Sequence, residues 1–129
     1  WITLQQGVEF VVQNFSRMHG GEIFVPKIPS MRILDLVESM APGIQTCNIG
    51  IRPGEKLHEI MCPADDSHLT LEFADHYVIR PTIRFSVESD YAVSALGERG
   101  VPVSPGFEYS SGNNPEFLSV DELRRLNEA

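Results

Sequence analysis

Residues 48–61 read NIGIRPGEKLHEIM, a charged turn set between two apolar runs. The four residues Arg52 to Glu55 have the composition of one β-turn, because Pro53 fixes φ at the second position and Gly54 accepts a positive φ at the third. A type II turn would bring its end Cα atoms within about 7 Å and hold a guanidinium beside a carboxylate. The arginine of this pair can donate hydrogen bonds to two phosphate oxygens, and the glutamate can accept hydrogen bonds from sugar hydroxyls. A surface turn with a weak ion pair is the alternative.

The segments before this turn predict a strand, a helix and a second strand. Ile23 to Val25 is a short apolar run, and a helix with one apolar stripe is expected between Ser30 and Pro42. Ile49 to Ile51 is the next apolar run. This order indicates a βαβ unit with a right-handed crossover. Ligands of open α/β sheets bind at the carboxyl ends of strands, so the turn after Ile51 lies in a favoured place.

The rest of the chain predicts a helix at each end and a short hairpin. Thr3 and Gln6 have capping-box spacing at the start of a helix over residues 4–17, and Ser119 and Glu122 repeat that spacing before the last helix. Residues 69–73 and 77–79 predict an antiparallel hairpin, and alternation returns over residues 83–87. We therefore expect a mixed α/β (α+β) fold.

Composition limits the possible partners. The chain has 129 residues, the size of one ordinary domain, and 18 acidic against 10 basic residues give a net charge of −8. This charge argues against nucleic acid and favours a focused anion site at Arg52 and Lys56. No apolar stretch approaches the roughly 20 residues of a membrane span, so we expect a cytoplasmic protein without a membrane partner. The opening residue, Trp1, already lies near a structured pattern, which indicates a piece of a longer protein.

The usual patterns of metal and catalytic sites are missing from this sequence. The spacing of the four histidines fits neither a zinc protease nor a Cys/His structural site. Cys47 and Cys62 are expected to be free thiols, Cys47 as a small buried side chain. The pair Gly20-Gly21 precedes a strand, whereas a dinucleotide fingerprint follows a strand and opens a helix. We therefore expect no metal, no catalytic residue and no cofactor-binding residue in this chain.

A polar cluster precedes the last helix. It contains Glu108, Tyr109, Ser110 and Ser111, followed by Asn113 and Asn114. One interpretation is a turn-rich tail tied down by Tyr109 and Phe117. The other is a docking segment at a subunit or domain interface.

Three motifs, taken in order, resemble the C-terminal part of inverting UDP-N-acetylglucosamine 4,6-dehydratases of the extended short-chain dehydrogenase/reductase family. They are GGEIFVPK at residues 20–27, GIRPGEKLHE at residues 50–59 and the polar cluster at residues 108–114. The resemblance covers nearly the whole chain. It implies a nucleotide-sugar-binding lobe at residues 1–83 and a C-terminal extension at residues 84–129 that packs on this lobe or on a neighbouring subunit.

The same resemblance implies residue roles. Arg52 would contact the diphosphate of a UDP-amino sugar, Glu55 would bind the ribose hydroxyls of uridine, and Lys56 is a further candidate for a phosphate-side or structural contact. The family reaction passes hydride from sugar C4 to NADP, removes water across C5 and C6, and returns hydride to C6 with inversion at C5. The NADP site and the catalytic residues belong to an N-terminal Rossmann part that is not in this chain.

We therefore expect this chain alone to be inactive. The whole enzyme would be a homo-oligomer in surface-glycan synthesis of the pseudaminic acid type. Two alternatives remain open: the lobe of a related nucleotide-sugar epimerase or reductase, and a non-catalytic assembly module.

Overall fold

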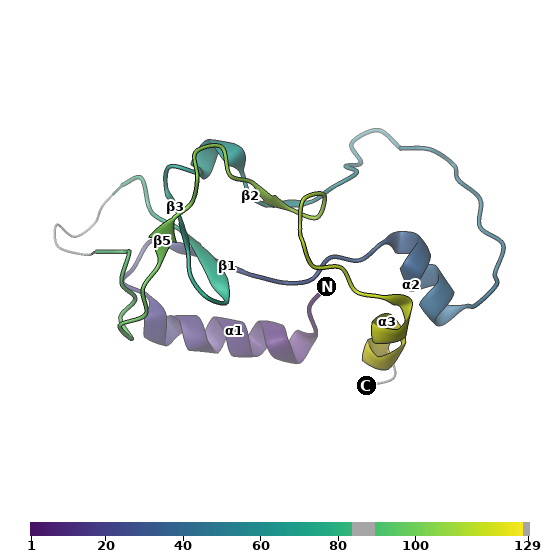
Figure 1. The fold of residues 1–129 in the computed structure, drawn as a ribbon, viewed down its shortest axis with the longest axis horizontal. Coiled ribbons are helices and arrows are strands. Elements are labelled where there is room, and N and C mark those ends of the chain that lie inside the picture. The colour runs from purple at the N-terminus through teal and green to yellow at the C-terminus, as the bar shows by residue number, and fades with distance from the viewer. Residues whose placement is uncertain (84–89, 128–129) are drawn as a thin grey trace. The chain divides into compact units, whose positions relative to one another are not determined.

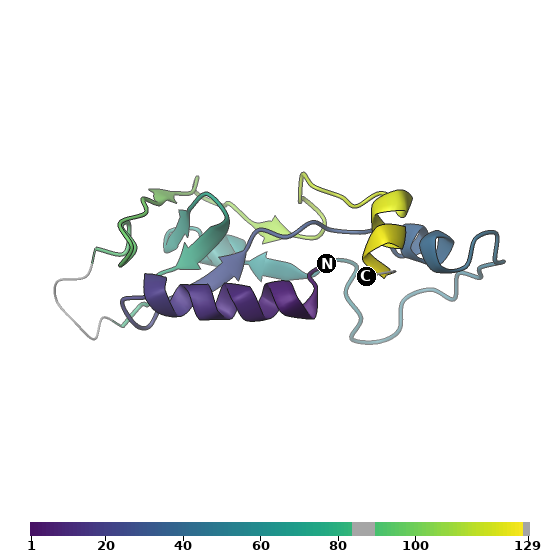
Figure 2. The ribbon, with the colours of Figure 1, turned by 90° about the horizontal axis from the view of Figure 1, so that it is seen from below.

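The computed structural model describes residues 1–83 and 90–127 and groups them into two compact units. The first, which we call the turn unit, comprises Trp1 and residues 28–59 and 111–127. The second, the sheet unit, comprises residues 2–27, 60–83 and 90–110. Each unit combines segments that are distant in the sequence, as the colours of Figures 1 and 2 show. The expected division between residues 83 and 84 stays a prediction.

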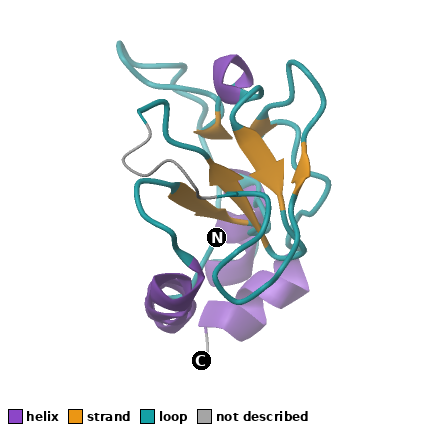
Figure 3. Cartoon of the chain, turned by 90° about the vertical axis from the view of Figure 1, so that its left-hand side faces the viewer, coloured by secondary structure: helices purple, strands orange, loops and turns teal. Residues whose placement is uncertain are grey.

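The sheet unit contains one long helix and two antiparallel sheets (Figure 3). Helix α1 (Leu4–Arg17) precedes the first strand, β1 (Ile23–Pro26). The larger sheet has the order β1-β4-β3-β5, with β3 at Thr70–Glu72, β4 at His76–Ile79 and β5 at Val101–Pro102. The smaller sheet pairs β2 (Ile60–Cys62) with β6 (Tyr109–Ser110), and a short 3-10 helix, η1 (Ala64–Asp66), follows β2.

Strand β4 lies at the centre of the hydrophobic core. Its four residues are all buried. Since successive side chains of a strand point to opposite faces, Tyr77 and Ile79 join one apolar cluster and Val78 joins another. The first cluster also contains Val25, Cys62 and Tyr109, and the second contains Leu71, Phe73 and Tyr91.

The turn unit is built on two short helices that pack together. They are α2 (Ile33–Met40) and α3 (Val120–Asn127), and Leu123 of α3 is fully buried. Upstream of α3, the buried Asn114 donates from Nδ2 to the carbonyl of Ile28 at 2.7 Å and to Ser30 Oγ at 3.0 Å. These bonds join the segment before α3 to the segment before α2.

Much of the predicted fold is confirmed. The mixed α/β class, the helix over residues 4–17, the hairpin and the last helix are all present. The predicted run over residues 83–87 falls mostly on residues 84–89, which lie outside the described residues. In the parts of the chain that the structure describes, no helix has both the length and the apolar character needed to cross a membrane.

The predicted βαβ unit is wrong. Residues 48–51 are exposed and belong to no strand, and β1 pairs antiparallel with β4 instead. The physical reason lies at Gly50, whose φ of 79° breaks an extended backbone in the middle of the apolar run. The turn therefore follows a loop and not a strand end.

Helix α1 begins with the capping box that the sequence predicts. Thr3 Oγ1 accepts from the Gln6 amide at 3.2 Å, and Gln6 Oε1 accepts from the Thr3 amide at 3.0 Å. We expect Thr3→Ala to lower the free energy of unfolding by about 1 kcal/mol, because a backbone donor loses its acceptor. Thr3→Ser keeps the acceptor and serves as the control in urea unfolding. Equal losses in both variants would contradict the capping role.

Candidate functional site

The Arg52 to Glu55 turn forms as the sequence predicts. The Glu55 amide donates to the Arg52 carbonyl at 3.1 Å, and Gly54 has the positive φ, 85°, that a type II turn requires. The Glu55 carboxylate accepts from the Arg52 amide at 2.7 Å and from Arg52 Nε at 2.8 Å, with Nη2 at 2.6 Å. The predicted cation and carboxylate are therefore held together.

The pair is open to solvent. The side chain of Arg52 is 74% exposed and that of Glu55 is 39% exposed. An exposed ion pair adds little to the free energy of unfolding. We therefore infer that the pairing of Arg52 with Glu55 serves to fix the conformation of the turn. Its contacts use Nε and Nη2 of Arg52, which leaves Nη1 outside the pair.

The side-chain and backbone hydrogen bonds of Arg52 lower the pKa of Glu55 below its ordinary value of 4.5. Any stability from this pair is present above the ordinary pKa and is lost as the pH falls through the lowered pKa. We expect Arg52→Ala to raise the pKa of Glu55 toward 4.5 in a carboxyl NMR titration. Glu122 is the control, because its lowered pKa depends first on Ser119. An unchanged Glu55 pKa would contradict the pairing.

A concave surface that encloses a volume of about 920 Å³ lies along the loop that carries the turn. Its polar lining includes Asn48, Glu55, Lys56 and Glu59, and its apolar lining includes Ile33, Ile51 and Leu57. The volume is within the range of about 300–1,000 Å³ that small-molecule sites occupy. Of the three predicted site residues, Glu55 and Lys56 line this surface. Arg52 is not a lining residue but is bonded to one of them, Glu55.

The polar cluster at residues 108–114 supports the interpretation of a tied-down tail. Tyr109 and Ser110 are buried in β6, and the Tyr109 ring lies 5.1 Å from the Tyr77 ring, centroid to centroid. Asn114 is also buried. These three side chains pack within the chain, as the tied-down tail predicts for Tyr109, whereas Phe117 is 43% exposed. The docking alternative stays a prediction.

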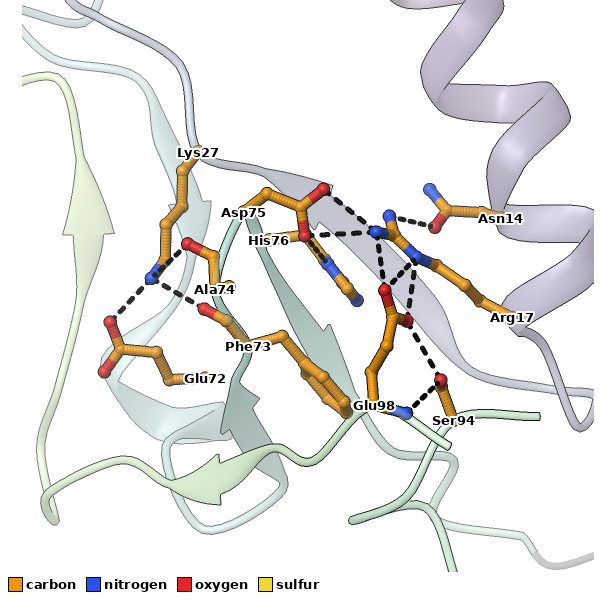
Figure 4. Close-up of polar contacts among 10 residues, drawn as sticks. All are labelled: Asn14, Arg17, Lys27, Glu72, Phe73, Ala74, Asp75, His76, Ser94 and Glu98. Carbon is orange, nitrogen blue, oxygen red and sulfur yellow. Dashed lines mark hydrogen bonds and ion pairs between the residues drawn. The ribbon is translucent and has the colours of Figure 1, made fainter. Parts of the chain in front are cut away.

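A cluster of ion pairs around the buried Arg17, in the sheet unit, was missed by the sequence interpretation (Figure 4). Arg17 is only 3% exposed. Its Nη2 lies 3.0 Å from Asp75 Oδ2 and 3.0 Å from Glu98 Oε1, and its Nη1 donates to Asn14 Oδ1 at 3.3 Å. No local sequence pattern indicates this cluster, because the two carboxylates lie 58 and 81 positions from Arg17.

The cluster shifts the pKa values of both carboxyls downward. The Arg17 hydrogen bond is the largest cause for Glu98. For Asp75, burial acts most strongly and would raise the pKa, but the combined hydrogen bonds and charges of His76 and Arg17 outweigh it. Asp75 Oδ1 lies 2.7 Å from Nδ1 of the buried His76, whose ring stacks on Phe73 at 4.7 Å. We read this cluster as a structural clamp between α1, the β3–β4 turn and the segment at Glu98.

The described residues contain neither a cluster of metal-binding side chains nor a dinucleotide-binding turn at Gly20-Gly21. Within residues 1–83 and 90–127, no group of three or more His, Cys, Asp or Glu side chains could hold a metal ion. Gly20 and Gly21 lie before β1 and open no helix, so they form no dinucleotide-binding turn. Cys47 and Cys62 are free, but Cys47 is exposed, so its expected burial is wrong.

The fold and the turn define a mixed α/β domain with an arginine–carboxylate pair beside a concave surface. The sequence profile of a family described as polysaccharide biosynthesis protein matches residues 1–81. The chain belongs to this polysaccharide biosynthesis family.

Individual relatives agree with this assignment. The chain is 57% identical over 127 residues to the UDP-N-acetylglucosamine 4,6-dehydratase (inverting) of Campylobacter jejuni subsp. jejuni serotype O:2, a match over 98% of this chain and 38% of that protein. It is 27% identical to the UDP-glucose 4-epimerase of Rickettsia massiliae, over 97% of this chain and 36% of the relative. The chain thus spans well under half the length of these curated relatives.

A solved structure shares the fold. The X-ray structure of Pen from Bacillus thuringiensis superposes with a TM-score of 0.71 and 26% identity, over 97% of this chain and 36% of that chain. The structural match and the epimerase relative agree with the predicted lobe of an extended short-chain dehydrogenase/reductase.

Proposed function

We propose that this chain is the UDP-sugar-binding part of an inverting UDP-N-acetylglucosamine 4,6-dehydratase. The observation that carries the proposal is the 57% identity to a relative of that name over nearly the whole chain. The concave surface has a size suited to a small-molecule ligand, and Glu55 in its lining is paired with Arg52, which can bind phosphate oxygens.

In the proposed complex, Arg52 holds the diphosphate, Glu55 accepts hydrogen bonds from the ribose hydroxyls, and Lys56 adds a cation on the phosphate side. Because Glu55 already bonds Arg52, ligand binding would divide the donors of the guanidinium between the carboxylate and the phosphates. The reacting groups and NADP would belong to the remainder of the longer protein, which acts in the cytoplasm in surface-glycan synthesis of the pseudaminic acid type.

Contacts with further chain segments also belong to the proposal. Helix α1 exposes an apolar face that includes Leu4, Val8, Val12 and Phe15. Exposed apolar faces of this kind mark interaction surfaces. We assign this face to contacts with an N-terminal Rossmann domain or with another subunit of a homo-oligomer.

Product identity tests the proposed activity in the full-length protein. With UDP-N-acetylglucosamine and NADP, a 4,6-dehydratase yields a product that has lost one water molecule, detectable by mass spectrometry. An epimerase, the second candidate favoured by the relative from Rickettsia massiliae, yields a product of unchanged mass. A product of unchanged mass would overturn the dehydratase assignment and leave the nucleotide-sugar-binding role.

A further inference from the structure

The loop that carries the turn has few fixed points of its own. Residues 42–59 are all exposed. The hydrogen bonds described for residues 48–55 join positions at most three apart, as in Gly50 to Asn48 and Arg52 to Glu55. These bonds shape the turn but do not locate it against the rest of the turn unit.

Two hydrogen bonds fix the loop just beyond the turn. The Glu59 amide donates to Ser111 Oγ at 3.0 Å, and the Ser111 amide donates to the Glu59 carbonyl at 2.9 Å. Both backbone polar groups of Glu59 are therefore bonded to one residue, 52 positions away. Glu59 itself lines the concave surface, together with Glu55, Lys56 and Leu57.

Gly112 makes a second contact with the same part of the loop. A Cβ atom at this position would lie 2.9 Å from Cγ and 3.0 Å from Cδ2 of His58. Side-chain carbons do not approach this closely, so any larger residue must displace the His58 ring or the backbone beneath it. His58 Nδ1 also lies 3.4 Å from Ser111 Oγ.

We propose that Ser111 and Gly112 are positioning residues for the proposed nucleotide-sugar site. Together they form a latch on His58 and Glu59. His58, the first residue that the latch holds, follows Glu55 by three residues, a span of at most about 10 Å of extended chain. The latch thereby restricts where Glu55 and Lys56 stand along the concave surface. The inference rests on the proposed function and assigns a binding-related role to the polar cluster before α3.

The test compares affinities for UDP-N-acetylglucosamine, measured by calorimetry, with thermal unfolding midpoints. Gly112→Ala crowds His58, and Ser111→Ala removes the acceptor of the Glu59 amide. We expect each to weaken binding about tenfold, because a small displacement of the wall spoils several contacts at once. Ser111→Thr keeps a hydroxyl and should retain affinity better than Ser111→Ala. The double variant His58→Ala, Gly112→Ala removes the ring that is crowded and should bind more tightly than Gly112→Ala.

Gly100→Ala is the matched control. A Cβ atom there would meet the Phe73 ring in the sheet unit, so this variant should lower the unfolding midpoint and leave the affinity unchanged. If Ser111→Ala and Gly112→Ala both bind UDP-N-acetylglucosamine as tightly as the wild type, the latch is overturned but the proposed site is not. No binding by the wild-type chain would overturn the proposed site itself and the latch with it.

Discussion

Arg17→Ala is expected to lower the free energy of unfolding of the sheet unit by about 2–3 kcal/mol. Removing one member of a fully buried ion pair costs about 3–5 kcal/mol. Here the side chains of Asp75 and Glu98 are 54% and 38% exposed, so water can solvate them partly after the change. Near-ultraviolet circular dichroism suits the measurement, because the three tyrosines are buried in the sheet unit.

Arg124→Ala is the control for this change. Its partners Asp121 and Glu38 lie at 3.0 Å and 3.9 Å and are 83% and 49% exposed, so the loss should stay below about 1 kcal/mol. The pH dependence gives a second check. Because the pKa values of Asp75 and Glu98 are lowered, their contribution is present above the ordinary carboxyl pKa and is lost as the pH falls through the lowered values. Arg17→Ala should reduce this acid sensitivity, chiefly the part due to Glu98, because the His76 hydrogen bond still lowers the pKa of Asp75 in the variant. An unchanged profile would contradict the clamp.

Arg52→Ala is expected to weaken binding of UDP-N-acetylglucosamine by at least about tenfold, or about 1.4 kcal/mol. The reason is the loss of a guanidinium that can bond two phosphate oxygens at once. Arg52→Lys should also bind weakly, since an ammonium keeps the charge but not the planar fork. The free energy of unfolding should change little in both, because the Arg52 side chain is 74% exposed. Arg124→Ala again serves as the control. Wild-type affinity in Arg52→Lys would contradict the claim that the Arg52 guanidinium bonds two phosphate oxygens at once.

The sequence predicted the features that short segments determine. Thr3 with Gln6 and Ser119 with Glu122 mark helix starts, and their capping bonds are present as expected. Pro53 and Gly54 likewise specify the turn through local backbone preferences. The candidate site could be predicted to this extent because its central pair lies within four consecutive residues.

Features that depend on distant residues could not be predicted in this way. The apolar run Ile49 to Ile51 has the composition of a strand, but Gly50 has a positive φ and the run forms no strand. Strand β1 pairs with β4 instead. The burial of Arg17 depends on carboxylates from two remote segments. The contact of Gly112 with His58 joins positions that no local pattern connects.

Calorimetric titration of UDP-N-acetylglucosamine into the wild-type chain and into Arg52→Ala tests the central claim most directly. UDP alone, run in parallel, isolates the nucleotide and diphosphate part of the ligand. We predict saturable binding of both ligands to the wild type and a loss of at least about tenfold in Arg52→Ala. No binding to the wild type at millimolar ligand, or equal affinity in the variant, would contradict the assignment of the turn to a nucleotide sugar.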